Sequence, residues 1–86
     1  MGGAMLQELK NKDMRVVGLK QTIRSIQAGK AKQVFLAKDV DKYIEDMVTE
    51  ECHRHGLSII YIDTMEELGK ACGISLGAAT AAILKE

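Results

Sequence analysis

Two apolar patterns alternate along the chain, and this alternation limits the folds that it can adopt. Short apolar or β-branched runs at residues 15–17, 34–37 and 57–62 are typical of buried strands. Residues 20–28, 40–52 and 65–72 instead carry apolar side chains at helical spacing. The chain has eight glycines and no proline, so glycine must end these segments. Strands that alternate with helices predict an α/β fold with three layers, in which helices cover both faces of one sheet.

The most regular helical pattern precedes Gly56, and its other face is acidic. Its apolar residues recur at intervals of three and four, and we expect one face of a helix to carry all of them. They are Val40, Tyr43, Ile44, Met47, Val48 and Cys52. The pattern closes with a cationic turn before Gly56, which is typical of a helix C-terminus.

Two other helices have recognisable features. Residues 20–28 are expected to turn Ile23 and Ile26 inward. A later helix is expected to begin at the capping box of Thr64 and Glu67, in which the threonine caps a backbone amide and the glutamate reaches back.

The two ends of the chain allow more than one interpretation. Residues 78–84 favour a helix by propensity, although their small side chains would also suit a strand that helices approach closely. We expect residues 1–13 to be a leader with one or two helical turns around Leu6 and Leu9, and residues 14–86 to form a single domain. Residues 1–3 fit either a natural start or a cloning remnant.

The net charge is zero, but the charges are separated along the chain. Residues 10–38 contain eight basic side chains and one acidic, a net charge of +7. Residues 39–67 contain nine acidic side chains and two basic, a net charge of −7. This separation predicts two faces of opposite charge, of which the basic one is a candidate surface for phosphate. The alternative is that both are simply solvated helix surfaces.

Motifs of common enzyme classes are missing from the sequence. It contains no Walker loop, no GxGxxG and no GxSxG motif. The candidates for a metal or thiol site are Cys52, His53 and His55, which Cys72 could join if the fold brings it near. However, Cys52 lies on the apolar stripe, where a cysteine usually only packs.

Nothing in the sequence predicts secretion or membrane insertion. The two cysteines form no disulfide framework, and the N-terminus lacks an apolar signal core. The longest apolar-leaning run, residues 74–84, has 11 residues, whereas a membrane helix needs about 20. We therefore expect a cytoplasmic protein.

The segment from Gly18 to Arg24 is the strongest candidate for function. A strand is expected to end at Gly18, and the free amides of the following helix start can face an anion. Lys20, Gln21 and Arg24 cluster around this first turn. Lysine donates to guanine O6 and N7, glutamine both donates and accepts, and arginine binds phosphate or guanine. The cluster predicts a nucleic-acid-binding surface, while an ordinary helix start with exposed polar residues remains the alternative.

Three segments, Val17–Arg24, Ala37–Asp41 and Leu68–Ala79, carry a resemblance in their order and spacing. Together they resemble the ribosomal L-seven-Ae/L-thirty-e family of kink-turn RNA-binding proteins, and most closely its short bacterial members. The resemblance covers residues 14–84. It implies an α/β/α sandwich with a small mixed sheet of about four strands, in which residues 78–84 form a strand.

The resemblance also implies a target and a binding surface. A kink-turn is an RNA helix interrupted by a three-nucleotide bulge and followed by tandem sheared G·A pairs, and its kink opens a groove that A-form RNA hides. Lys20 and Gln21 would read the guanines, with Arg24 on the same face. Gly18 and Leu19 would bring backbone amides to the RNA, and Lys38 would meet phosphates. The loop of Ile74, Ser75 and Leu76 would pack beneath the extruded bulge nucleotide.

In the family that the chain resembles, archaeal and eukaryotic members typically carry Asn-Glu at the positions of Lys20 and Gln21. A glutamate accepts more strongly than a neutral glutamine from the amino group of guanine. The resemblance implies a monomer that binds ribosomal or riboswitch-like RNA without a cofactor, a metal or catalysis, and without a membrane or a small-molecule substrate. The alternative is a protein-interaction adaptor on the same fold, with the acidic helix of residues 41–51 as its partner surface.

Overall fold

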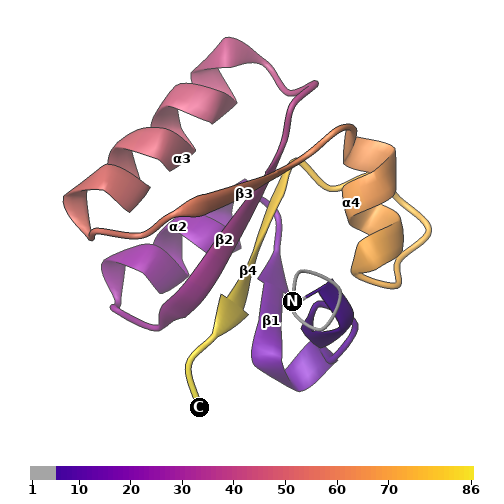
Figure 1. The fold of residues 1–86 in the computed structure, drawn as a ribbon, viewed down its shortest axis with the longest axis horizontal. Helices are drawn as coiled ribbons and strands as arrows, with labels where there is room; N and C mark the ends of the chain where they lie inside the picture. Colours follow the sequence, from indigo (N-terminus) through magenta and orange to yellow (C-terminus); the bar gives the residue numbers. More distant parts are fainter. Residues whose placement is uncertain (1–5) are drawn as a thin grey trace.

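The computed structural model describes residues 6–86, in which four strands form one mixed sheet (Figure 1). The elements are the 3-10 helix η1 (Lys12–Met14), β1 (Arg15–Val17), α2 (Leu19–Gln27), β2 (Ala31–Ala37), α3 (Lys42–Arg54), β3 (Ile59–Ile62), α4 (Met65–Ala71) and β4 (Thr80–Leu84). Residues 6–8 are also helical. The strand order is β1-β4-β2-β3, with β2 parallel to β3 and β4 antiparallel to both β1 and β2.

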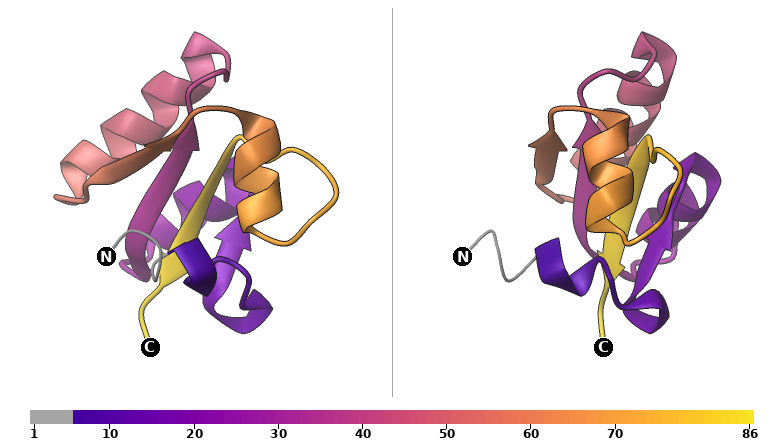
Figure 2. Two further views of the ribbon diagram at one scale, coloured as in Figure 1. Left: turned by 45° about the vertical axis from the view of Figure 1, so that its right-hand side comes forward. Right: turned by 90° about the vertical axis from the view of Figure 1, so that its right-hand side faces the viewer.

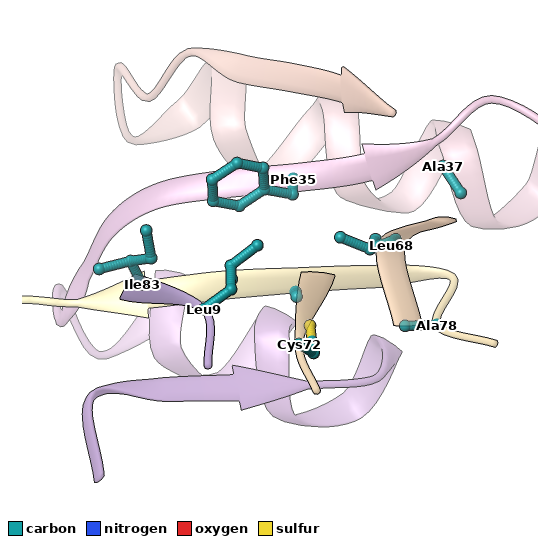
Figure 3. Packing of buried hydrophobic residues seen from close by; sticks show 8 residues of the cluster. Leu9, Phe35, Ala37, Leu68, Cys72, Ala78 and Ile83 are labelled. Carbon is teal, nitrogen blue, oxygen red and sulfur yellow. The ribbon is translucent and has the colours of Figure 1, made fainter. Parts of the chain in front are cut away.

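Helices cover both faces of the sheet, which confirms the predicted α/β/α layers (Figure 2). One face packs against α2 and α3 through a cluster that includes Ile26, Val34, Leu36, Val48, Cys52 and Ala82. The other face packs against α4 and the N-terminal segment through Leu9, Phe35, Ala37, Leu68, Cys72, Ala78, Ala81 and Ile83 (Figure 3). Successive residues of β2 therefore belong to opposite clusters, which explains why its sequence is a continuous apolar run.

The ends of the helices largely follow the predicted signals. Thr64 caps α4, because its Oγ1 accepts a hydrogen bond from the backbone amide of Glu67 at 3.0 Å. The amide of Met65 donates to Oδ1 of Asp39 at 2.8 Å, a cap from outside the helix that the sequence did not suggest. Strand β2 begins at Ala31, three residues before the predicted run, because Ala31 and Gln33 pair with β4.

Residues 80–84 form a strand, β4, as the family resemblance implies and against their helix propensity. This strand lies between β1 and β2. Ala81 and Ala82 point to opposite faces of the sheet and are fully buried in the two clusters. Small side chains therefore stand where helices or the N-terminal segment cover the strand on both faces. Thr80 is also fully buried, and its hydroxyl donates to the carbonyl oxygen of Phe35. Tertiary packing therefore overrides local propensity here.

The prediction that one helix face carries all the apolar residues of 40–52 was wrong, because the buried face of α3 is narrower. Ile44, Val48 and Cys52, spaced by four, pack into the cluster under α3. Tyr43 and Met47 are 65% and 36% exposed, because each lies one residue, or about 100° of helix rotation, away from that line. Val40 precedes the helix, whose N-cap is Asp41.

The prediction of a buried strand at residues 57–62 was also wrong in extent and burial. Strand β3 covers only Ile59–Ile62 and lies at the edge of the sheet. It pairs on one side with β2, and Tyr61 remains 46% exposed. An edge strand has no second neighbour to cover it, so a continuous apolar run does not guarantee burial.

The N-terminal segment contributes to the core. Leu9 is fully buried and Leu6 packs against the same cluster. The Nε atom of Arg15 donates to the carbonyl oxygen of Leu9 at 2.9 Å, which ties the segment to β1. The boundary at residues 13 and 14 stays a prediction, and the interpretation of residues 1–3 lies outside the described residues. Within residues 6–86, no helix has the length and apolar character needed to cross a membrane.

Candidate nucleic-acid interface

The start of α2, the end of β2 and the segment before β4 meet at one end of the sheet (Figure 1). Lys38 directly follows β2. Strand β4 is antiparallel to both of its neighbours, so it begins where they end. The amide of Gly18 donates to the carbonyl oxygen of Thr80 at 2.9 Å, and the amide of Ala37 donates to that of Ala79 at 2.9 Å. Segments far apart in the sequence are thus joined by backbone hydrogen bonds.

Gly18 is the N-cap of α2 and adopts φ 100° and ψ 159°. This region of backbone conformation is essentially restricted to glycine. A Cβ atom added at Gly18 would meet nothing within 4 Å, so the backbone conformation, not packing, requires glycine. Gly18 also forms no side-chain cap hydrogen bond. The amides of the first turn are therefore available to an external acceptor, near the positive end of the helix dipole.

The side chains of α2 divide into a buried and an exposed face. Thr22, Ser25 and Ile26 are buried, and Leu19 packs against the cluster under α2 and α3. Lys20, Gln21 and Arg24 are exposed, as predicted. The first turn contains no acidic residue, and no ion pair among the described residues involves Lys20 or Arg24. Their charges are free to meet an anionic partner.

Lys38 also lies at this end of the sheet, but its charge is shared. Its Nζ atom lies 3.2 Å from Oδ1 of Asp63, and both side chains are more than half exposed. The parallel pairing of β2 with β3 brings the residues that follow the two strands together. Sequence reasoning missed Asp63, because no local signal shows that the two strands are neighbours. An exposed pair of this kind contributes little stability, so a phosphate can compete with Asp63 for Lys38.

The loop of residues 74–76 presents both buried and exposed side chains. Ile74 packs against the cluster under α4, whereas Ser75 and Leu76 are exposed. Leu76 is 76% exposed, the highest value among the large hydrophobic residues of the described chain. The backbone of the loop is tied to α4, because the amide of Ile74 donates to the carbonyl oxygen of Gly69 at 3.1 Å.

The residues suggested for a metal or thiol site are not brought together. Cys52 and Cys72 are each 1% exposed, and they belong to the clusters on opposite faces of the sheet. His55 lies at the end of α3, where its Nδ1 atom is 3.0 Å from the carbonyl oxygen of Glu51. Within residues 6–86, no three His, Cys, Asp or Glu side chains gather in a way that could hold a metal ion.

Burial of Cys52 predicts a loss of stability at alkaline pH. Burial, and secondly the carboxylate of Glu51, raises the pKa of the Cys52 thiol from 9.0 to about 11. Above pH 9 the unfolded thiol ionises while the folded one stays protonated, so the free energy of unfolding falls as pH rises towards 11. Urea unfolding across this range should show a steeper decline in the wild type than in Cys52→Ala. Parallel pH profiles for the two proteins would contradict this expectation.

Comparisons with known proteins extend the resemblance over almost the whole chain. A model of the family described as Ribosomal protein L7Ae/L30e/S12e/Gadd45 matches residues 3–86. An RNA-binding protein of Caldanaerobacter subterraneus subsp. tengcongensis is 50% identical over 68 residues, which cover 79% of this chain and 83% of that protein. An RNA-binding protein of Geobacillus stearothermophilus is 43% identical over 70 residues, which cover 81% of this chain and 85% of that protein. The solved structure of a Giardia lamblia 15.5kD RNA binding protein matches with a TM-score of 0.81 at 25% identity, and the match covers 95% of this chain and 72% of that one.

Proposed function

We propose that this chain, which belongs to the Ribosomal protein L7Ae/L30e/S12e/Gadd45 family, binds RNA and that its target is the kink-turn. The observation that carries the proposal is the exposed, unpaired cluster of Lys20, Gln21 and Arg24 at the uncapped start of α2. An adaptor without RNA binding has no need for these residue types at a helix start. The short bacterial relatives named as RNA-binding proteins support the RNA-binding part of this proposal.

The chemistry of the cluster suits the guanines of sheared G·A pairs. Lysine donates to guanine O6 and N7, and the side-chain amide of glutamine both donates and accepts. The backbone amides after Gly18 and the positive end of the helix dipole favour a phosphate close by. Because these contacts require an opened groove, the protein would bind the kinked RNA more tightly than the straight form and would shift the RNA towards the kink.

This mode of action needs neither a cofactor nor catalysis, and we propose that the chain acts as a monomer. Ribosomal RNA and riboswitch-like RNA both provide kink-turns. The sequence pI of about 6.7 is low for a permanent ribosomal subunit, which must neutralise many phosphates. We therefore favour an accessory RNA-binding role.

The test is a titration of the protein into a labelled kink-turn RNA at fixed salt. The control RNA carries Watson–Crick pairs in place of both G·A pairs and has the same length and charge. We expect sub-micromolar binding to the kink-turn and at least roughly tenfold weaker binding to the control, which corresponds to about 1.4 kcal/mol. Equal affinity for the two RNAs would refute kink-turn recognition. No binding to either would favour the adaptor function.

The ion pair of Lys38 with Asp63 predicts a gain in affinity from a single substitution. Asp63→Asn keeps the shape of the side chain, frees Lys38 for phosphate and removes a negative charge beside the RNA. From the small energy of exposed ion pairs, we expect binding to all RNAs to tighten by up to about fivefold. Lys38→Ala should instead weaken the binding of every RNA. It should also reduce the slope of log affinity against log salt concentration by about the contribution of one phosphate contact.

Asp46→Asn is the matched control for this prediction. Asp46 forms a similar exposed pair with Lys42 on α3, at 3.3 Å, and neither residue is among those proposed to contact RNA. It removes the same charge, so an effect of overall charge would appear in both variants. If Asp63→Asn gains no more affinity than Asp46→Asn, Lys38 does not contact the RNA.

A further inference from the structure

The glycine at position 69 has no backbone reason to be a glycine. It lies within α4, and its φ is outside the left-handed region. A Cβ atom built there would lie 2.0 Å from the carbonyl oxygen of Leu76 and 3.0 Å from its carbonyl carbon. No real Cβ atom tolerates the first of these contacts. Only a residue without a side chain lets the loop lie directly on the helix.

Other contacts hold the same loop at its two ends. The amide of Ile74 donates to the carbonyl oxygen of Gly69, and the amide of Ala78 donates to that of Met65 at 2.9 Å. Where the loop leaves α4, the Nη2 atom of Arg15 donates to the carbonyl oxygen of Cys72 at 3.1 Å. All of these contacts engage the loop backbone. The side chain of Leu76 is left free and exposed to solvent.

We propose that Gly69 is a positioning residue for RNA binding, which acts by fixing the loop that presents Leu76 to an unpaired, extruded base. The inference rests on the proposed function. An exposed leucine on a loop already held by the backbone offers an apolar surface without the entropic cost of ordering the loop on binding. The chain has few aromatic residues, so an aliphatic surface of this kind must replace ring stacking.

A side chain at Gly69 is expected to displace the loop and leave the helix in place. Helix α4 is anchored in the core by Leu68 and Cys72, which are 0% and 1% exposed. The loop residues Ser75, Leu76 and Gly77 are exposed and are the part able to move. Gly69→Ala should therefore disturb the contact with the extruded base and leave the surface around Lys20 intact.

A double-mutant cycle between protein and RNA tests this inference. One RNA is the intact kink-turn, and the other carries an abasic site in place of the extruded nucleotide. We expect the wild type to bind the abasic RNA roughly tenfold more weakly, because the base contact is lost. Gly69→Ala should bind the intact RNA roughly tenfold more weakly than the wild type and should lose little further on the abasic RNA. Leu76→Ala, which removes the apolar side chain without moving the backbone, should behave in the same way.

Gly56→Ala controls for a loss of stability. Gly56 has φ +66° with nothing within 4 Å of an added Cβ, and it precedes β3, at the end of the sheet away from Lys38. Gly56→Ala is strained, but it should show the same loss of affinity for the abasic RNA, relative to the intact kink-turn, as the wild type. If Gly69→Ala weakens binding to both RNAs equally, its role is structural and the inference is overturned.

The remaining outcomes separate this inference from the proposed function. If the wild type prefers the kink-turn to its Watson–Crick control but tolerates the abasic site, only the role of the loop is refuted. If it shows no preference for the kink-turn, the proposed function fails first. If Gly69→Ala does not fold, Arg15→Met removes the hydrogen bond to Cys72, together with the one to Leu9, and keeps the aliphatic stem. Arg15→Met should then lose less affinity than the wild type when the intact RNA is replaced by the abasic RNA. A loss equal to that of the wild type would overturn the inference.

Discussion

Replacement of both Lys20 and Gln21 by alanine is expected to lower the affinity for kink-turn RNA by roughly a hundredfold. Each contact to a guanine edge contributes about 1–3 kcal/mol of discrimination, and adjacent contacts are not fully additive. Binding to the control RNA with Watson–Crick pairs should fall much less, because it loses only the charge of one lysine. Parallel titrations of the two RNAs at one salt concentration measure the difference.

The fold should tolerate this double substitution. Both side chains are exposed, and alanine favours the helix in which they lie. The matched control is the double variant Gln27→Ala and Lys30→Ala, which removes the same two residue types where α2 ends at Gln27 and in the turn that follows it; both side chains are also exposed. If the two double variants lose affinity for the kink-turn equally, or if the first loses equally on both RNAs, the start of α2 does not read the G·A pairs.

Phe35→Ala is expected to have the largest effect on stability. Phe35 is fully buried in the central strand β2 and packs in the cluster under α4 with Leu9 and Leu68 (Figure 3). Truncation of a buried phenylalanine costs about 3–5 kcal/mol, through lost burial and the cavity that remains. Small domains have only about 5–15 kcal/mol of stability, so this one change should remove a large part of it. Urea unfolding followed by circular dichroism measures the loss.

Tyr43→Ala is the control for this prediction and also examines the corrected face of α3. Tyr43 is 65% exposed, and an exposed substitution of this kind changes stability by about 0.5 kcal/mol or less. A cost for Tyr43→Ala comparable to that for Phe35→Ala would contradict the packing of α3 described above.

Features that depend on neighbours in the sequence were predictable. Apolar spacing within each segment identified α2, α3 and α4, because helix periodicity is a property of consecutive residues. Thr64 indicated the start of α4, because a capping side chain bonds to a backbone amide only three residues away. The candidate surface around Lys20 was also predictable, since its three side chains lie within two turns of one helix. Their contact with RNA stays a prediction.

Features that depend on distant segments were not predictable from the residues. Strand β4 has the propensity of a helix, and it was expected as a strand only because of the family resemblance. The exposure of Tyr61 follows from the edge position of β3, which strand order alone decides. The Lys38–Asp63 ion pair likewise depends on which strands are adjacent.

The sequence by itself therefore determined the layered α/β class, the approximate positions of the helices and the exposed basic turn after Gly18. Local hydrogen bonding and periodicity are sufficient for these. Only the tertiary structure decided that β4 lies inside the sheet, that Leu9 fills the core, and that Gly69 lies against the carbonyl of Leu76. Each of these depends on packing between segments that the chain separates, and burial at such contacts outweighs local propensity.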